Sequence, residues 1–175
     1  MGETSTQAAM GEGTTLGSLA LGRSEWLAIT QDMVDQFGAL TLDPDPMHVD
    51  PDWAIRNGPF GGPIVFGFQT LAMLSYFGHQ LFESAGLNSR FAPSEGHLLN
   101  YGLDRVRFLS PVRVGDRIRA NFIRGVMRQE SPERQRFDFD VEIEAEERNK
   151  PALSLSWIWL WFPRNADGGK DLGDA

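Results

Sequence analysis

The chain contains no cysteine among its 175 residues. This excludes disulfide bonds and thiolate nucleophiles and fits a reducing compartment, so we expect a cytoplasmic protein. No stretch of about 18 consecutive apolar residues is present, which speaks against a transmembrane helix and a membrane partner. The net charge of −8 disfavours a general nucleic-acid partner, because phosphate binding needs a basic face.

The composition is that of one soluble globular domain, with 41% hydrophobic and 23% charged residues. Residues 1–14 lack the basic and apolar regions of a secretory signal, and we expect them to form a disordered leader. Residues 165–175 are polar and rich in glycine, which predicts a flexible tail. The folded domain is therefore expected over residues 15–164.

Helical periodicity dominates the first half of the chain. A short amphipathic helix is expected over residues 31–41, with Thr30 as its N-cap. A second short helix is expected from Pro51 to about Arg56, since proline is favoured in a first turn. A long helix is expected over residues 67–85. Over its first half, apolar residues would cover nearly every side of the helix, which predicts that it is buried.

The second half changes to the period of strands. The sequence RFDFDVEIEAE alternates apolar and acidic residues, which predicts an antiparallel strand with one buried face. The final strand is apolar on both faces, which indicates a central position or a subunit interface. Four long strands are expected, over residues 97–109, 116–130, 134–147 and 151–163. This order predicts an α+β domain in which a curved antiparallel sheet encloses one helix.

The segment LDPDPMHVDPDW places Asp43 and His48 five residues apart. Its prolines restrict the backbone, so we expect a stiff loop rather than a helical turn, holding the carboxylate and the imidazole toward a common point. A neutral histidine can take a proton from water, and a nearby carboxyl group can orient that water or return a proton. The alternative is a plain turn in which aspartates such as Asp45 or Asp50 cap the next helix.

The loop NGPFGGP then leads into the long helix near Gly67. A helix start carries unpaired N–H groups and a partial positive charge. The backbone N–H near Gly67 could therefore stabilise a developing enolate oxygen. The alternative is that Gly67 is small only to let the helix pack on the sheet.

These two features, in this order, resemble motifs of the MaoC-like dehydratases, a family that includes the R-specific enoyl-CoA hydratases. The family motif Asp-x-Asn-Pro-x-His-x-Asp stands here as DPDPMHVD, with Asp45 at the position of Asn. The motif Ile-x-His-Gly-Met stands within GGPIVFGFQTLAML, with Gly67 kept, Phe66 in place of His and Phe68 in place of Met. The resemblance covers about residues 17–163.

The resemblance implies a hotdog fold and a homodimer or higher homo-oligomer with sheets joined edge to edge. It implies reversible addition of water to a 2-enoyl thioester of CoA or of acyl carrier protein, without a metal or redox cofactor. Asp43 and His48 would be the catalytic pair, and Gly67 would supply the oxyanion N–H. Val65 and Phe66 would line the substrate pocket, where Phe66 makes the wall more apolar and suits a bulky, branched or aromatic acyl group.

Two other functions remain open. A thioesterase on the same fold would usually carry a carboxylate on the long helix, which offers only Gln69 in its first turns and Glu83 near its far end. A non-catalytic acyl-binding subunit would not need both Asp43 and His48.

Arginines in the strands are a further candidate feature. Some could meet the phosphates of a CoA carrier, or they could pair with the acidic strand over residues 138–146. They are Arg105, Arg107, Arg113, Arg117 and Arg119. His79 and His97 are expected to be packing or surface residues.

Overall fold

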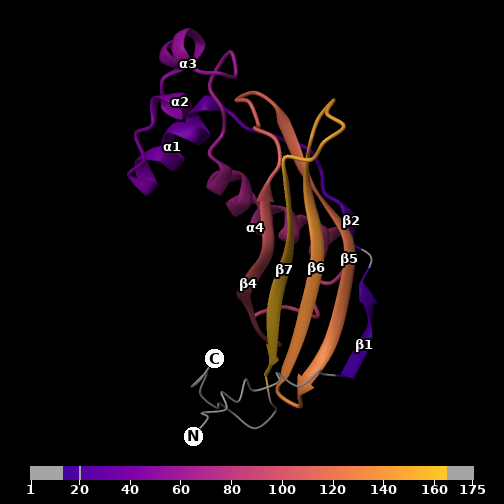
Figure 1. Cartoon of the computed structure of the whole chain (residues 1–175). Coiled ribbons are helices and arrows are strands. Elements are labelled where there is room, and N and C mark those ends of the chain that lie inside the picture. Colours follow the sequence, from indigo (N-terminus) through magenta and orange to yellow (C-terminus); the bar gives the residue numbers. More distant parts are fainter. Residues whose placement is uncertain (1–13, 20, 165–175) are drawn as a thin grey trace, which may run out of the picture.

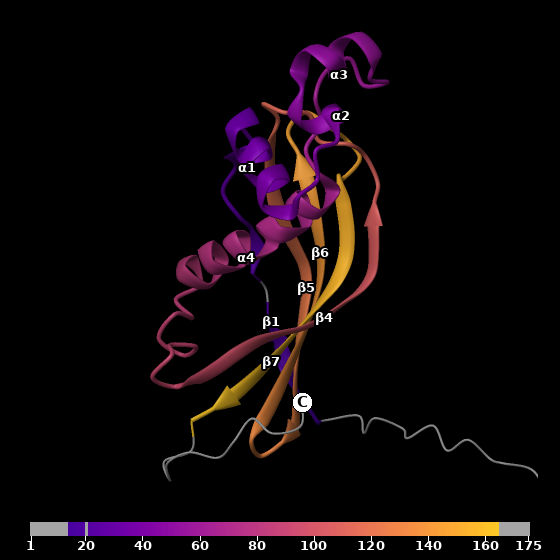
Figure 2. The same ribbon diagram turned by 90° about the vertical axis from the view of Figure 1, so that its left-hand side faces the viewer.

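The structure, a computed structural model, describes residues 14–19 and 21–164 and contains one antiparallel sheet with a long helix against it (Figures 1 and 2). The strands are β1 (Thr14–Leu19), β2 (Gly22–Arg23), β3 (Leu27–Ala28), β4 (Gly96–Phe108), β5 (Arg117–Ser131), β6 (Arg134–Ala145) and β7 (Leu153–Pro163). The helices are α1 (Gln31–Thr41), α2 (Pro46–Val49), α3 (Pro51–Asn57) and α4 (Gly67–Ser84). The predicted α+β class and the four long strands are confirmed.

The strand order is β1-β5-β6-β7-β4, and β2 and β3 also pair with β5. The final strand, β7, therefore lies inside the sheet between β6 and β4, which confirms the predicted central position. Because β7 is paired on both sides, it cannot join the sheet of a second chain edge to edge, and the alternative of a subunit interface formed by this strand's edge is wrong. Among the described strands, β4 is the outermost one on that side of the sheet.

The predicted leader and tail lie outside the described residues, except for Thr14, which begins β1. Figures 1 and 2 show α1, α2 and α3 gathered at one end of the sheet. Helix α1 begins where predicted, because the Thr30 side chain accepts a hydrogen bond from the Met33 N–H at 3.3 Å. It ends at Thr41, and the C-cap residue Leu42 adopts the left-handed conformation with φ 58°.

The core lies between α4 and the sheet. Leu74, Phe77 and Leu81 of α4 are buried in one cluster with aromatic residues of β6 and β7. Gly78 allows close approach here, because a Cβ on it would lie 3.2 Å from a ring carbon of Trp159 and 3.3 Å from one of Trp157. The inward residues of β6 are buried as their alternation predicts: Phe137, Phe139, Val141 and Ile143.

Helix α4 is buried on one side only, which differs from the prediction of a helix buried nearly all round. Phe68 is 70% exposed and Tyr76 is 43% exposed. The physical reason is that the sheet of a single chain covers one face of the helix. The opposite face of α4, which carries both apolar and polar side chains, is exposed in the single chain.

On the other face of the sheet, acidic side chains of β6 and of Glu146, directly after its end, pair with arginines. Arg117 lies 2.9 Å from Glu146, Arg119 lies 2.7 Å from Glu144, and Arg105 also pairs with a β6 carboxylate. Three of the five arginines singled out in the sequence are thus neutralised across strands rather than kept for a phosphate.

Candidate functional site

The segment around His48 forms one helical turn, α2, so the prediction of a loop rather than a helical turn is wrong. Proline suits the first helical position because its missing N–H needs no partner there. Pro46 occupies that position, and the Asp45 side chain caps the turn by accepting the Met47 N–H at 2.9 Å. Asp50 caps α3 in the same way, accepting the Trp53 N–H at 2.9 Å. The capping role considered for these two aspartates is confirmed.

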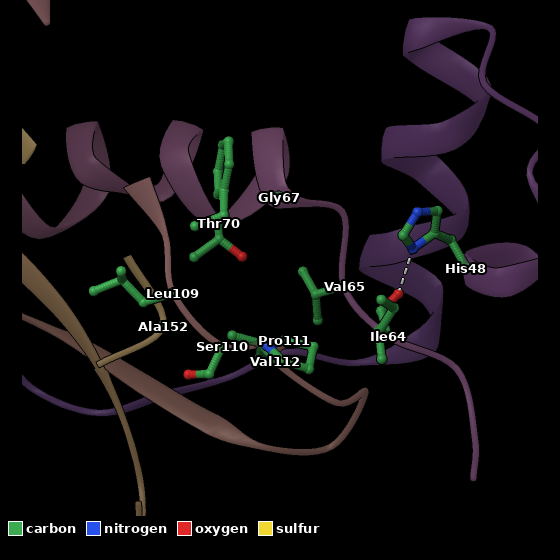
Figure 3. A pocket seen from close by; sticks show the side chains of 11 residues that line it. His48, Ile64, Val65, Gly67, Thr70, Leu109, Ser110, Pro111, Val112 and Ala152 are labelled. Carbon is green, nitrogen blue, oxygen red and sulfur yellow. Dashed lines mark hydrogen bonds between the residues drawn. The ribbon is translucent and has the colours of Figure 1, made fainter. Parts of the chain in front are cut away.

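The imidazole of His48 is fixed by a contact with the chain before α4. Its Nδ1 lies 2.7 Å from the carbonyl oxygen of Ile64, as the dashed line in Figure 3 shows. A carbonyl oxygen only accepts hydrogen bonds, so Nδ1 carries the proton in a neutral ring and Nε2 keeps its lone pair. The side-chain amide of Gln31 donates to the carbonyl oxygen of His48 at 2.8 Å. Both the ring and the backbone of His48 are therefore held.

His48 and the start of α4 border the same cavity, which has a volume of about 270 Å³. Val65, Gly67 and Thr70 form its wall on the α4 side, and the end of β4 with the segment after it forms the opposite wall (Figure 3). Phe66 is the N-cap residue of α4, and its side chain makes no capping hydrogen bond. The N–H groups of the first turn thus have no side-chain partner and give this end of the cavity a partial positive charge.

Gly67 also has a packing role. A Cβ at this position would lie 3.1 Å from two ring carbons of Phe108, closer than such contacts usually are. The two alternatives considered for Gly67, close approach to a ligand and close packing, are therefore compatible. Val65 lies on the cavity wall, where the sequence predicted a pocket residue.

Asp43 does not border this cavity in the structure. Its side chain is exposed, and Oδ1 accepts the Asp45 N–H at 3.1 Å. It borders a separate cavity of about 430 Å³ together with Leu42 and Val49. The structure thus brings His48, Val65 and Gly67 together but leaves the Asp43 carboxylate outside the cavity.

Phe66 is not among the residues that line the cavity either. It is buried behind His48, with the two ring centroids 3.9 Å apart and the ring planes 32° apart. It also contacts Phe37, with ring centroids 5.4 Å apart. Phe66 therefore supports the imidazole from behind rather than forming the substrate wall expected from the sequence.

Some polar groups at the site were not found by sequence reasoning. The hydroxyl groups of Thr70 and Ser110 border the cavity, where they donate to the backbone carbonyls of Phe66 and Pro151 at 3.3 and 2.9 Å. Gln31 reaches His48 across 17 positions in sequence. No local pattern marks such long-range contacts, so only the fold reveals them.

The described residues contain no group of three or more histidine, aspartate or glutamate side chains arranged to hold a metal ion. In the part of the chain that the structure describes, no helix has both the length and the apolarity needed to cross a bilayer.

The long helix on a curved antiparallel sheet, with a cavity at the helix start, defines a hotdog-fold domain. The model of the MaoC-like domain matches residues 19–146, and the chain belongs to this family. The predicted fold and family are therefore confirmed. The (R)-hydratase from A. caviae involved in PHA biosynthesis has a similar fold, with a TM-score of 0.57 at 20% identity over 88% of this chain and 98% of that one.

Two curated relatives are similar at the level of sequence. Nodulation protein N of Rhizobium leguminosarum bv. viciae is 43% identical over 103 residues, which are 59% of this chain and 60% of that protein. The 3-hydroxyacyl-thioester dehydratase Z of Mycobacterium tuberculosis is 43% identical over 100 residues, 57% of this chain and 60% of that protein. The chain thus spans about 60% of the length of the curated relatives it matches.

Proposed function

We propose that this protein is a hydro-lyase that adds water to, or removes it from, the 2,3 double bond of an enoyl thioester carried by CoA or acyl carrier protein. The observation that carries the proposal is the hydrogen bond between His48 Nδ1 and the Ile64 carbonyl oxygen. It leaves Nε2 as a proton acceptor on a side chain that borders the same cavity as the start of α4. A base and an oxyanion-binding helix start are two of the parts that this reaction requires.

In the hydration direction, the thioester carbonyl oxygen accepts a hydrogen bond from the Gly67 N–H. His48 Nε2 takes a proton from water while the water oxygen forms a bond to C3 of the acyl group. The electrons of the double bond move toward the carbonyl oxygen and give an enolate, which the start of α4 stabilises. The enolate then takes a proton at C2, and we assign its delivery to Asp43 in its protonated form; the proton that His48 took from water passes back to the Asp43 carboxylate, which restores both side chains. That step requires the Asp43 carboxyl group to turn away from the Asp45 N–H.

One assay tests the proposal against its alternatives. Purified protein is given a panel of 2-enoyl-CoA thioesters, and the loss of the conjugated absorbance is followed beside the release of free thiol. Hydration without thiol release supports the proposal. Thiol release would instead favour a thioesterase, and inactivity across a broad panel would favour a non-catalytic acyl-binding subunit.

The geometry of α4 speaks against the thioesterase. Gln69 is buried, and its amide donates to the Met33 carbonyl oxygen at 3.0 Å. Glu83, the carboxylate of this helix, is exposed near its far end. Helix α4 therefore presents no carboxylate to the cavity beside Gly67.

The contact between Phe66 and His48 leads to a prediction about the catalytic rate. Phe66→Leu should lower kcat roughly 10-fold with little change in KM, because a loosened imidazole spends less time in the reactive geometry. Phe66→His, which restores a flat ring and the family residue, should keep a rate near that of the wild type. Steady-state kinetics on both variants would measure these values, and Tm would check that each variant folds. An unchanged kcat in Phe66→Leu would contradict this positioning role.

We also propose that a second copy of the chain pairs with β4, giving a homodimer. Edge strands present unpaired backbone groups that favour pairing with another chain. Strand β4 exposes the apolar side chains Leu99, Tyr101 and Leu103, and Phe68 is exposed on the neighbouring helix. Apolar groups exposed over two neighbouring elements are typical of a protein interface.

The dimer proposal predicts that Leu103→Lys weakens association at least about 10-fold in Kd, because a charge at an edge strand opposes pairing. Leu16→Lys is the matched control, since Leu16 is also an exposed leucine but lies on β1. Light scattering over a dilution series measures the mass. A wild-type protein that stays near the chain mass of 19.5 kDa at all concentrations would refute the dimer.

A further inference from the structure

The backbone of His48 is tied to α1 by the side chain of Gln31. The amide nitrogen of Gln31 donates to the carbonyl oxygen of His48 at 2.8 Å and to Oδ1 of Asp35 at 2.8 Å. A carbonyl oxygen and a carboxylate oxygen both accept hydrogen bonds, so these two neighbours determine which end of the amide faces them. Gln31 is the first residue of α1, and its side chain links the start of this helix to the turn that carries His48.

A second glutamine links α1 to α4. Gln69 lies two residues after Gly67 and is 2% exposed. Its amide nitrogen donates to the carbonyl oxygen of Met33 in α1 at 3.0 Å. Helix α1 is therefore bonded to the backbone of His48 through Gln31, and to the helix that begins at Gly67 through Gln69.

Together with the bond from the His48 ring to the Ile64 carbonyl oxygen, these contacts form a closed path. The path runs from α4 through Gln69 to α1, then through Gln31 to α2. The ring of His48 completes it at the chain segment that leads into α4. Each link joins a side-chain nitrogen to a backbone carbonyl oxygen. The imidazole and the start of α4 are thus held relative to each other from two directions.

Both glutamines keep an amide oxygen buried without a hydrogen-bond partner among the described residues. A buried polar atom that lacks a partner lowers stability. Methionine has a similar size and would avoid this cost. Packing and stability therefore do not by themselves explain glutamine at positions 31 and 69, and departures of this kind are typical of functional sites.

We propose that Gln31 and Gln69 are positioning residues, which hold His48 Nε2 in a fixed place relative to the Gly67 N–H through α1. This inference rests on the proposed function, because the two groups that it relates are the proposed base and oxyanion donor. Neither glutamine is among the residues that line the cavity of His48. Both act through other residues, so their effect should fall on kcat and leave KM nearly unchanged.

An exchange of two side chains separates positioning from helix stability. In the double variant Gln31→Glu and Asp35→Asn, the asparagine amide can donate to the glutamate, which keeps the pair within α1. The glutamate carboxylate cannot donate to the His48 carbonyl oxygen. We expect kcat to fall at least about 10-fold, with KM and Tm near the wild-type values. The matched control is Gln36→Glu with Asp32→Asn, because Gln36 donates to Asp32 at 2.7 Å in the same helix and is exposed. The control should keep the wild-type kcat.

The second link predicts coupled effects. Gln69→Met removes the bond between α4 and α1, and it should lower kcat by a factor similar to that of Gln31→Met. Because both bonds lie on one path, the variant with both substitutions should be scarcely slower than either single variant. Residues that act independently would give effects that multiply, and that result would overturn the shared path through α1.

NMR of the ring nitrogens separates this inference from the proposed function, because it needs no substrate. The His48 signals are identified by their absence in His48→Ala, at a pH where the ring is neutral. The wild type should show one tautomer with the proton on Nδ1, and the variant with Gln31→Glu and Asp35→Asn should show a mixture of tautomers.

This spectral change, in a wild-type protein that hydrates no thioester, would uphold the positioning role and reject the hydratase. Where the wild type does hydrate, an unchanged kcat in the variant with Gln31→Glu and Asp35→Asn would overturn the positioning role and leave the hydratase in place. An unchanged spectrum would overturn it as well, even beside a lowered kcat, because the loss would not arise at the ring.

Discussion

His48→Ala should lower the rate of hydration of a 2-enoyl thioester at least about 10²-fold, the lower end for loss of a positioned acid or base. The ring of His48 is held by the Ile64 carbonyl oxygen, so its free nitrogen is the proton acceptor that the substitution removes. The loss should fall on kcat, because the apolar walls that hold the acyl group remain. Single-turnover absorbance measurements on both proteins would give this difference directly.

His48→Asn separates the two roles of this side chain. The asparagine amide can still donate to the Ile64 carbonyl oxygen, but it cannot take a proton from water. The variant should therefore be as slow as His48→Ala if proton transfer is the role. Recovery of most of the activity in His48→Asn would show that the hydrogen bond to the Ile64 carbonyl oxygen matters more than proton transfer by this side chain. A wild-type rate in His48→Ala would remove His48 from the mechanism.

Asp43→Ala is expected to lower hydration by a similar factor, at least about 10²-fold. The structure makes this a demanding test, because the Asp43 carboxylate accepts the Asp45 N–H and lies outside the cavity that His48 borders. If the carboxyl group turns inward to deliver a proton to C2, Asp43→Asn should be as slow as Asp43→Ala. An asparagine keeps the contact with the Asp45 N–H and loses only the transferable proton.

Asp45→Asn is the matched control for this pair. It carries the same chemical change two residues away, and asparagine also caps helices well, so the rate should stay near that of the wild type. If Asp43→Asn also retains full activity, the carboxylate has only the structural role seen here. His48 would then carry both proton transfers.

Local sequence signals were sufficient for most of the fold. Thr30 caps α1 as expected, and the alternation in β6 buries Phe137 and its neighbours. These features depend on residues within a few positions of one another. The prediction at α2 is wrong for a local reason too: proline disfavours a helix interior, but at the first helical position, which Pro46 occupies, it is compatible with the helix.

The site depends on contacts between distant parts of the chain, which no local pattern reveals. His48 meets Ile64 across 16 positions, and the ring of Phe66 contacts both Phe37 and His48. The motif predicts His48 and Gly67 as site residues, and both border the same cavity. It did not determine that Phe66 lies behind the imidazole, or that Asp43 borders a different cavity.

Gly78 has a consequence for how the domain unfolds. Glycine in a helix interior costs about 1 kcal/mol relative to alanine, and an isolated helix of 18 residues is only marginally stable in water. Helix α4 therefore depends on its packing against the sheet, which includes the indoles of Trp157 and Trp159. Loss of the helix and loss of sheet packing become one cooperative event, so this helix is not an independently folding unit.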